Sequence, residues 1–139
     1  MSITSQYRSQ HAELADLAEQ LLAILDAGNL AERALEVTQL LTLFAARLKV
    51  HLSMEDLSLY PRLIQSANPS CAETALQFQS AMGGLQQDFE QYMTKWSVAR
   101  RIQADTAAFI GATHTLLQAL HTRMDKENKI LYPLAEQQP

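Results

Sequence analysis

The sequence predicts an all-α protein, an up-down-up-down antiparallel four-helix bundle that forms a single domain over residues 1–139. Three observations carry this prediction. Glycine and proline are scarce, with four of each, as is typical of long helices joined by few turns. Apolar residues recur every three or four positions in four long stretches, and short runs of turn-forming residues separate those stretches. Four helices joined by short connections pack as antiparallel neighbours.

The first two helices follow from two apolar stripes. The first stripe predicts a helix from Ser5 to Leu25, and Gly28-Asn29 then ends it, because these residues tolerate a left-handed backbone. The second stripe predicts a long helix from Leu30 to about Ile64. Pro61 lies inside this stretch, and its missing N–H should kink or end the helix near Tyr60.

The second half of the chain repeats this pattern after a turn-rich stretch at residues 66–70. A third helix is predicted from about Cys71 to Trp96, and a fourth from about Ala104 to Leu134. Gly83 and Gly84 fall inside the third helix, where each costs about 1 kcal/mol relative to alanine. We therefore expect a local feature that requires the missing side chains.

Charge and composition narrow the range of partners. The formal net charge is −4, whereas nucleic-acid-binding proteins carry clustered Lys and Arg, so no nucleic-acid partner is expected. No apolar run reaches the length of about 18 residues that a membrane span needs, and the first residues do not resemble a signal peptide. The lone Cys71 cannot form an internal disulfide and is expected to be inert. These features predict a cytoplasmic protein without a membrane partner.

A pattern that occurs twice carries the functional prediction. Glu55 begins a Glu-x-x-x-x-Tyr-Pro unit, and the same unit begins again at Glu127 in the second half of the chain. His51 lies one helical turn before Glu55, so the two side chains share a helix face and can clamp a cation. His11 lies on the apolar face of the first helix, one turn before Leu14, and it therefore points inward as well. By itself, a His-x-x-x-Glu pair is more often a hydrogen-bonded structural pair than a metal site.

These elements resemble the hemerythrin-like (HHE cation-binding) family. The family pattern is an inward histidine on the first helix, His-x-x-x-Glu followed by an aromatic-Pro pair on the second, and a similar arrangement on the last two helices. Here His11 lies within YRSQHAEL, and HLSMEDLSLYP runs from His51 to Pro61. The likeness extends over essentially the whole chain. It implies a hemerythrin-like four-helix bundle that draws metal ligands from both halves.

The second half departs from the family pattern. When the two copies are aligned with Glu55 on Glu127, Gly83 takes the place of His11 and Arg123 takes the place of His51, so both imidazoles are missing. Arg123 cannot be a ligand, but its fixed positive charge can occupy the place of the second cation and pair with both carboxylates. Gly83 is then expected to give the guanidinium room. The resemblance thus implies one metal at most, held by His11, His51, Glu55 and Glu127.

Mixed nitrogen and oxygen ligands suit iron and zinc alike, so the expected cofactor is one divalent ion of either metal. Such a protein would sense or store metal, or respond to oxygen or nitric oxide. Carriage of dioxygen as peroxide needs an electron from each of two irons and is not expected. The alternative is a metal-free helical module with a salt-bridged core around Arg123, which would bind a protein partner or a second copy. No nucleophile arrangement or phosphate loop identifies an enzyme, and neither catalytic residues nor an organic cofactor are predicted.

The remaining candidate residues have structural interpretations. His114 and His121 are expected at the surface, since His121 precedes Arg123 by two positions and lies well round the helix. Tyr60 and Tyr132 are expected to pack under the proline kinks, with their hydroxyls bonded to backbone or water.

Overall fold

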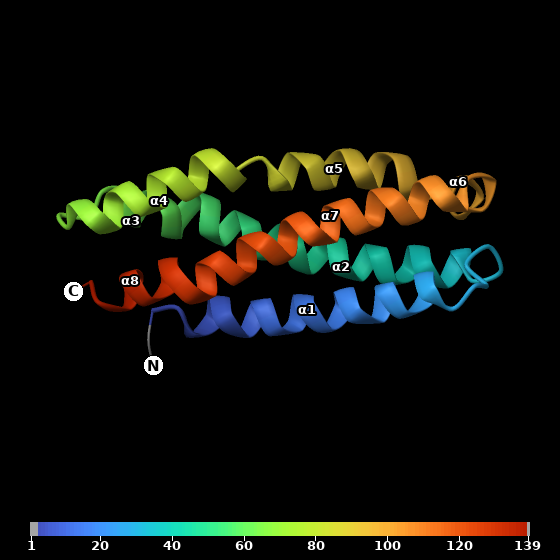
Figure 1. Ribbon diagram of the computed structural model, residues 1–139, viewed down its shortest axis with the longest axis horizontal. Coiled ribbons are helices and arrows are strands. Elements are labelled where there is room, and N and C mark those ends of the chain that lie inside the picture. Colours follow the sequence, from blue (N-terminus) through green and yellow to red (C-terminus); the bar gives the residue numbers. More distant parts are fainter. Residues whose placement is uncertain (1–2, 139) are drawn as a thin grey trace.

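The computed structural model describes residues 3–138, and all of the regular structure in that range is helical, which confirms the all-α class (Figure 1). The described residues form eight α-helices and two π-helical turns in place of four unbroken helices. In chain order these are α1 (Ser5–Asp26), α2 (Ala34–Met54), η1 (Glu55–Leu59), α3 (Tyr60–Ile64), α4 (Pro69–Met82), α5 (Leu85–Trp96), α6 (Ala99–Ala104), α7 (Thr106–Lys126), η2 (Glu127–Leu131) and α8 (Tyr132–Glu136). The long helices lie lengthwise beside one another, with α1 and α5 each packed against both α2 and α7. Over the described range, no helix is long and apolar enough to cross a bilayer.

The predicted helix ends are confirmed at both turns that the sequence marks most clearly. Gly28 follows α1 with a φ of 81°, the left-handed backbone that ends a helix. In the turn at residues 66–70, the Asn68 side chain accepts hydrogen bonds from the N–H groups of Ser70 and Cys71. Asn68 thereby caps α4, and Pro69 follows at a position where its missing N–H costs nothing.

The predicted third helix is divided at Gly83 and Gly84 into α4 and α5. A Cβ atom on Gly83 would lie 2.5 Å from the carbonyl oxygen of Gln79, closer than any side chain tolerates. Glycine is therefore required by the backbone where α4 ends. That Gly83 also gives the guanidinium of Arg123 room stays a prediction. The end of α4 also leaves the carbonyl of Met82 without an amide from a following turn. That carbonyl accepts a hydrogen bond from Arg123 instead, at 3.2 Å.

Both copies of the repeated unit form a π-helical turn. The N–H of Tyr60 bonds to the carbonyl of Glu55, and the N–H of Tyr132 bonds to that of Glu127, five residues back in each case. A proline ring in an α-helix collides with the carbonyl four residues back, and the wider π turn accommodates it. The irregularity predicted near Tyr60 is thus present, but as a π turn from which the helix continues through Pro61 into α3.

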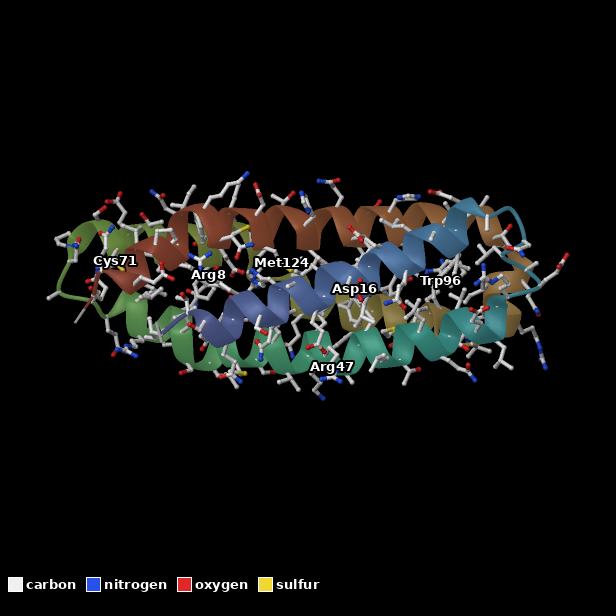
Figure 2. All side chains as sticks on the ribbon, turned by 90° about the horizontal axis from the view of Figure 1, so that it is seen from below. Arg8, Asp16, Arg47, Cys71, Trp96 and Met124 are labelled. Carbon is white, nitrogen blue, oxygen red and sulfur yellow. The ribbon has the colours of Figure 1, made fainter. Side chains whose placement is uncertain are left out.

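Two apolar clusters fill the interior. The larger lies among α1, α2, α5, α6 and α7 and includes Trp96, whereas the smaller lies among the start of α1, η1, α3, α4, η2 and α8 and includes Cys71 (Figure 2). We call a run of consecutive helices, such as α2, η1 and α3, a helical rod. Along three of these rods, a buried polar residue separates residues of the larger cluster from residues of the smaller one. The charged and imidazole side chains buried there are His11, His51, Glu55, Arg123 and Glu127. They form a polar layer shielded from water by apolar packing on either side.

Candidate metal centre

Four side chains in this layer converge from four helical segments. His11 comes from α1, His51 from the end of α2, Glu55 from η1 and Glu127 from η2. Each offers one nitrogen or oxygen atom, and these four atoms all lie within 4.8 Å of one another. All four residues are at most 3% exposed. The structure therefore brings together the whole set of ligands that the sequence predicted.

Hydrogen bonds from the outer nitrogen of each imidazole fix which nitrogen faces inward. The Nδ1–H of His51 donates to Oε1 of Gln10 at 2.6 Å, and the Nδ1–H of His11 donates to Oδ1 of Asn128 at 2.8 Å. The Gln10 amide is oriented by its own nitrogen, which donates to the sulfur of Met54. With the proton on Nδ1, the imidazole of His51 presents a bare Nε2 lone pair to the centre of the layer, while Nε2 of His11 lies 3.0 Å from the hydroxyl of Tyr132. Partners of this kind orient metal-binding histidines.

The inward nitrogens face carboxylate oxygens. Nε2 of His11 lies 3.1 Å from Oε1 of Glu127, and Nε2 of His51 lies 3.2 Å from Oε1 of Glu55. Two buried atoms among them, Nε2 of His51 and Oε1 of Glu127, have no hydrogen-bond partner. Lone pairs that face one another at this distance repel, and a buried polar atom without a partner is costly. A cation between them removes both penalties, so the residues present fit a bound metal ion.

The two tyrosines of the repeated unit cross to the opposite half. The hydroxyl of Tyr60 donates to Oε2 of Glu127 at 2.7 Å, and the hydroxyl of Tyr132 donates to Oε2 of Glu55. The prediction that these hydroxyls bond to backbone or water is therefore wrong. Burial raises the pKa of both tyrosines, and the neighbouring carboxylates raise it further, so both hydroxyls keep their protons and act as donors.

Arg123 is 1% exposed and pairs with both carboxylates, as predicted. Its Nη2 donates to Oε1 of Glu55 at 3.1 Å, and its Nε donates to Oε2 of Glu127 at 3.1 Å. The guanidinium also donates to two further acceptors, Oδ1 of Asp56 at 2.8 Å and the carbonyl of Met82 at 3.2 Å. The ring of Tyr60 lies below it, 5.3 Å away. The guanidinium is thus held by groups from both halves of the chain.

Carboxylates outnumber guanidinium groups in the layer. Glu55, Glu127 and Asp56 all pair with the single positive charge of Arg123, so these four side chains carry an excess of negative charge. The imidazole of His51 does not balance it, because burial and the neighbouring His11 lower its pKa to about 3, which keeps it neutral at physiological pH. Burial raises the pKa of Glu127, the expected response of a carboxyl without full compensation. The layer as a whole has the charge and the bare donor atoms of a cation site.

Sequence reasoning did not identify the supporting residues Gln10, Asn128 and Asp56. A signal was present, because Asp56 and Asn128 occupy equivalent positions of the repeat, each directly after one of the two glutamates. His114 and His121 lie at the surface of α7, as predicted, and take no part in the layer.

The hemerythrin HHE cation binding domain family matches residues 2–135. No curated protein and no solved structure matches the chain. The match spans both copies of the repeated unit and all the residues of the polar layer. The chain belongs to the hemerythrin HHE cation-binding domain family.

Proposed function

We propose that this protein binds one divalent metal ion through His11, His51, Glu55 and Glu127. The observation that carries the proposal is the pair of partnerless buried atoms, Nε2 of His51 and Oε1 of Glu127, in a layer with an excess of negative charge. Two imidazole nitrogens and two carboxylate oxygens suit iron and zinc alike. The Nδ1 partners Gln10 and Asn128 keep both imidazoles oriented with Nε2 toward an ion.

The proposal limits the protein to one ion. The place of a second ion between the carboxylates of Glu55 and Glu127 is taken by the guanidinium of Arg123. The repeat-related positions that would supply further imidazoles hold Gly83 and Arg123. A role in sensing or storing metal, or in responding to oxygen or nitric oxide, is consistent with a single ion. Transport of dioxygen by two irons is not.

A bound iron would supply a Lewis-acidic and redox-active centre for small ligands. The chain supplies the surroundings. Tyr60 and Tyr132 each hold one carboxylate oxygen by donating a hydrogen bond to it, so neither carboxylate is free to rotate. Apolar packing on both sides of the layer excludes water.

The finer architecture belongs to the same proposal. We infer the up-down-up-down order of four helical rods from the packing of α1 and α5 against both α2 and α7. The buried thiol of Cys71 in the described chain is compatible with a reducing compartment, and we therefore propose a cytoplasmic protein.

A metal-free interaction module is the second candidate function. The observation that favours it is the set of four hydrogen bonds from Arg123, which compensates much of the buried charge without an ion. On that account the layer would be a structural core, and binding of another protein would take place elsewhere.

Elemental analysis of the tag-free protein distinguishes the two functions. The protein is stripped with a chelator, reconstituted separately with Fe²⁺ under anaerobic conditions and with Zn²⁺, and then desalted. We expect about one equivalent of metal per chain for at least one of the two ions. Retention of neither ion would support the metal-free module, whereas two equivalents would contradict the assignment of Arg123 to the second position.

A further inference from the structure

We propose that Arg123 makes the metal site select divalent over trivalent ions. This inference rests on the proposed function, because it concerns an ion held by His11, His51, Glu55 and Glu127. It goes further by assigning the charge preference of the site to one residue that does not itself bind metal.

The position of the guanidinium relative to the ligands supports the inference. Each carboxylate contacts both Arg123 and one imidazole. Glu55 lies 3.1 Å from Nη2 of Arg123 and 3.2 Å from Nε2 of His51, while Glu127 lies 3.1 Å from Nε of Arg123 and 3.1 Å from Nε2 of His11. The positive charge of the guanidinium is thus separated from the inward imidazole nitrogens only by the width of one carboxylate group.

This charge is permanent. An arginine so placed is protonated at every pH at which the protein is folded.

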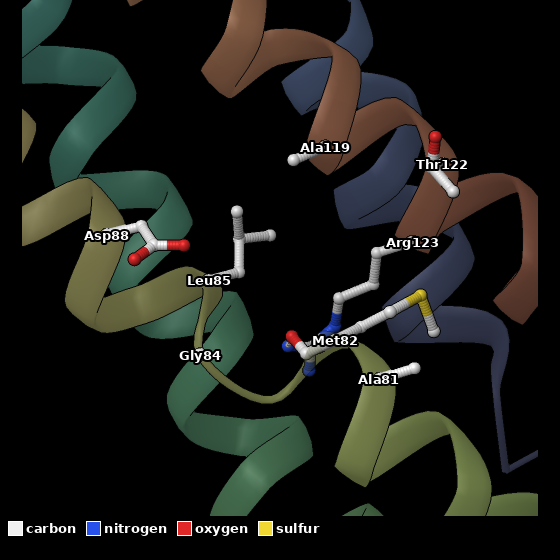
Figure 3. Close-up of a pocket in the computed structure, with 8 residues that line it drawn as sticks. All are labelled: Ala81, Met82, Gly84, Leu85, Asp88, Ala119, Thr122 and Arg123. Carbon is white, nitrogen blue, oxygen red and sulfur yellow. Dashed lines mark hydrogen bonds between the residues drawn. The ribbon is translucent and has the colours of Figure 1, made fainter.

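The charge is also fixed in position. Figure 3 shows the side chain extending from α7 toward Met82 at the break between α4 and α5, along a cavity of about 290 Å³. The carbonyl of Met82 and the carboxylate of Asp56 hold its two terminal nitrogens at 3.2 and 2.8 Å. A guanidinium restrained on several sides cannot move away from an ion of higher charge.

The balance of buried charge then differs between the two kinds of ion. The three carboxylates that contact Arg123, those of Glu55, Glu127 and Asp56, and its guanidinium sum to −2, so a divalent ion leaves this group neutral and a trivalent ion leaves it at +1. A buried uncompensated charge is costly, and the cost rises with its size. A trivalent ion carries one more unit charge than a divalent ion, and the guanidinium repels that extra charge across one carboxylate. At an effective dielectric constant of about 20, this repulsion changes the ratio of the divalent to the trivalent affinity on the order of 100-fold.

Competition titrations with Zn²⁺ and Ga³⁺ test the inference, because neither ion changes its oxidation state. Affinities are measured on the tag-free full chain against nitrilotriacetate at fixed pH, and the ratio of the Zn²⁺ to the Ga³⁺ affinity is compared among variants. We expect Arg123→Gln to lower this ratio about 100-fold and to strengthen the binding of both ions. Asp56→Asn removes a negative charge beside the guanidinium and should raise the ratio. Arg47→Gln, at a surface position paired with Glu13, should leave it unchanged.

The outcomes separate the inference from the proposed function. If Zn²⁺ binds the wild-type chain at one equivalent but Arg123→Gln leaves the ratio unaltered, or weakens both ions equally, Arg123 is only structural and the inference is wrong. If the wild-type chain binds neither ion, the proposed function is wrong and the inference fails with it. Should Arg123→Gln not fold, Asp56→Asn decides, because an unaltered or lowered ratio in that variant contradicts the inference.

Discussion

The two halves of this molecule share a backbone motif and differ in the charge that they place beside it. In both halves a glutamate begins a π turn, and the tyrosine at its end donates to the carboxylate of the opposite half. The first half adds two imidazoles whose Nε2 atoms face inward. The second half has an arginine in place of one and a glycine in place of the other. A guanidinium, which is part of the chain, thus supplies the positive charge that pairs with the two carboxylates.

Equivalent positions of the repeat support different groups in the two halves. Gln10 accepts from His51 in the first half, and its repeat equivalent, Met82, accepts from Arg123 through its backbone carbonyl. Asn128 accepts from His11, and its repeat equivalent, Asp56, accepts from Arg123. A guanidinium has more donors than an imidazole and needs more acceptors, and these two positions supply them.

The largest expected effect concerns the second half. Arg123→Ala should destabilise the metal-free protein by about 3 to 5 kcal/mol, because it leaves two buried glutamates without their common partner. Arg100→Ala, at an exposed position of α6, should change stability by less than about 0.5 kcal/mol. Urea unfolding of both variants measures the difference. Similar small losses in the two variants would mean that Arg123 does not hold the layer together.

The first half is tested by removal of one imidazole. His51→Ala should lower the Zn²⁺ affinity by about two orders of magnitude or more, since the loss of a ligand exceeds the roughly 10- to 100-fold effect of a supporting residue. His121→Ala, a surface histidine, should bind as the wild type does. Calorimetric titration compares them. Equal losses would show that the ion binds outside the polar layer.

The two halves should also differ in their response to pH, because an imidazole titrates and a guanidinium does not. Burial lowers the pKa of His51 to about 3, whereas in the unfolded chain it is about 6.5. Between these values the unfolded state binds more protons, so stability falls as the pH falls below about 6.5. We expect the metal-free protein to lose about 2 kcal/mol between pH 7 and pH 5 through this group.

The raised pKa of Glu127 has the opposite effect, because it increases stability as the pH falls. The contribution of His51 is therefore measured as a difference between the wild type and a His51 variant. Urea midpoints at pH 5 and pH 7 are measured for the wild type and for His51→Gln. The wild type should show the steeper loss toward acid. Parallel pH profiles would contradict a neutral, buried His51.

The smallest expected effect concerns a supporting residue of the first half. Gln10→Leu should lower the Zn²⁺ affinity about tenfold, because it removes the acceptor that fixes the tautomer of His51. Gln6→Leu, on the exposed face of the same helix, is the matched control. If both variants bind Zn²⁺ equally well, the orientation of His51 does not depend on Gln10.

The sequence predicted the all-α fold and the convergence of the four candidate ligands because helical periodicity and a repeat of constant spacing fix which residues share a face. Arg123 could be placed by the same repeat. The division of the third helix could not be predicted, because a glycine pair lowers the helix propensity but tertiary contacts can override that effect. The crossing of Tyr60 and Tyr132 to the opposite carboxylates was also missed, since a bond between segments so far apart in the sequence depends on how the rods pack.

The central claim is that a metal ion and Arg123 occupy neighbouring positions in one polar layer at the same time. A crystal structure of the Zn²⁺-loaded protein, with data collected on both sides of the zinc absorption edge, tests it most directly. The account predicts one anomalous peak among His11, His51, Glu55 and Glu127, with the Arg123 guanidinium still between the two carboxylates. A peak in the place of the guanidinium, or no peak in the layer at full zinc saturation, would contradict it.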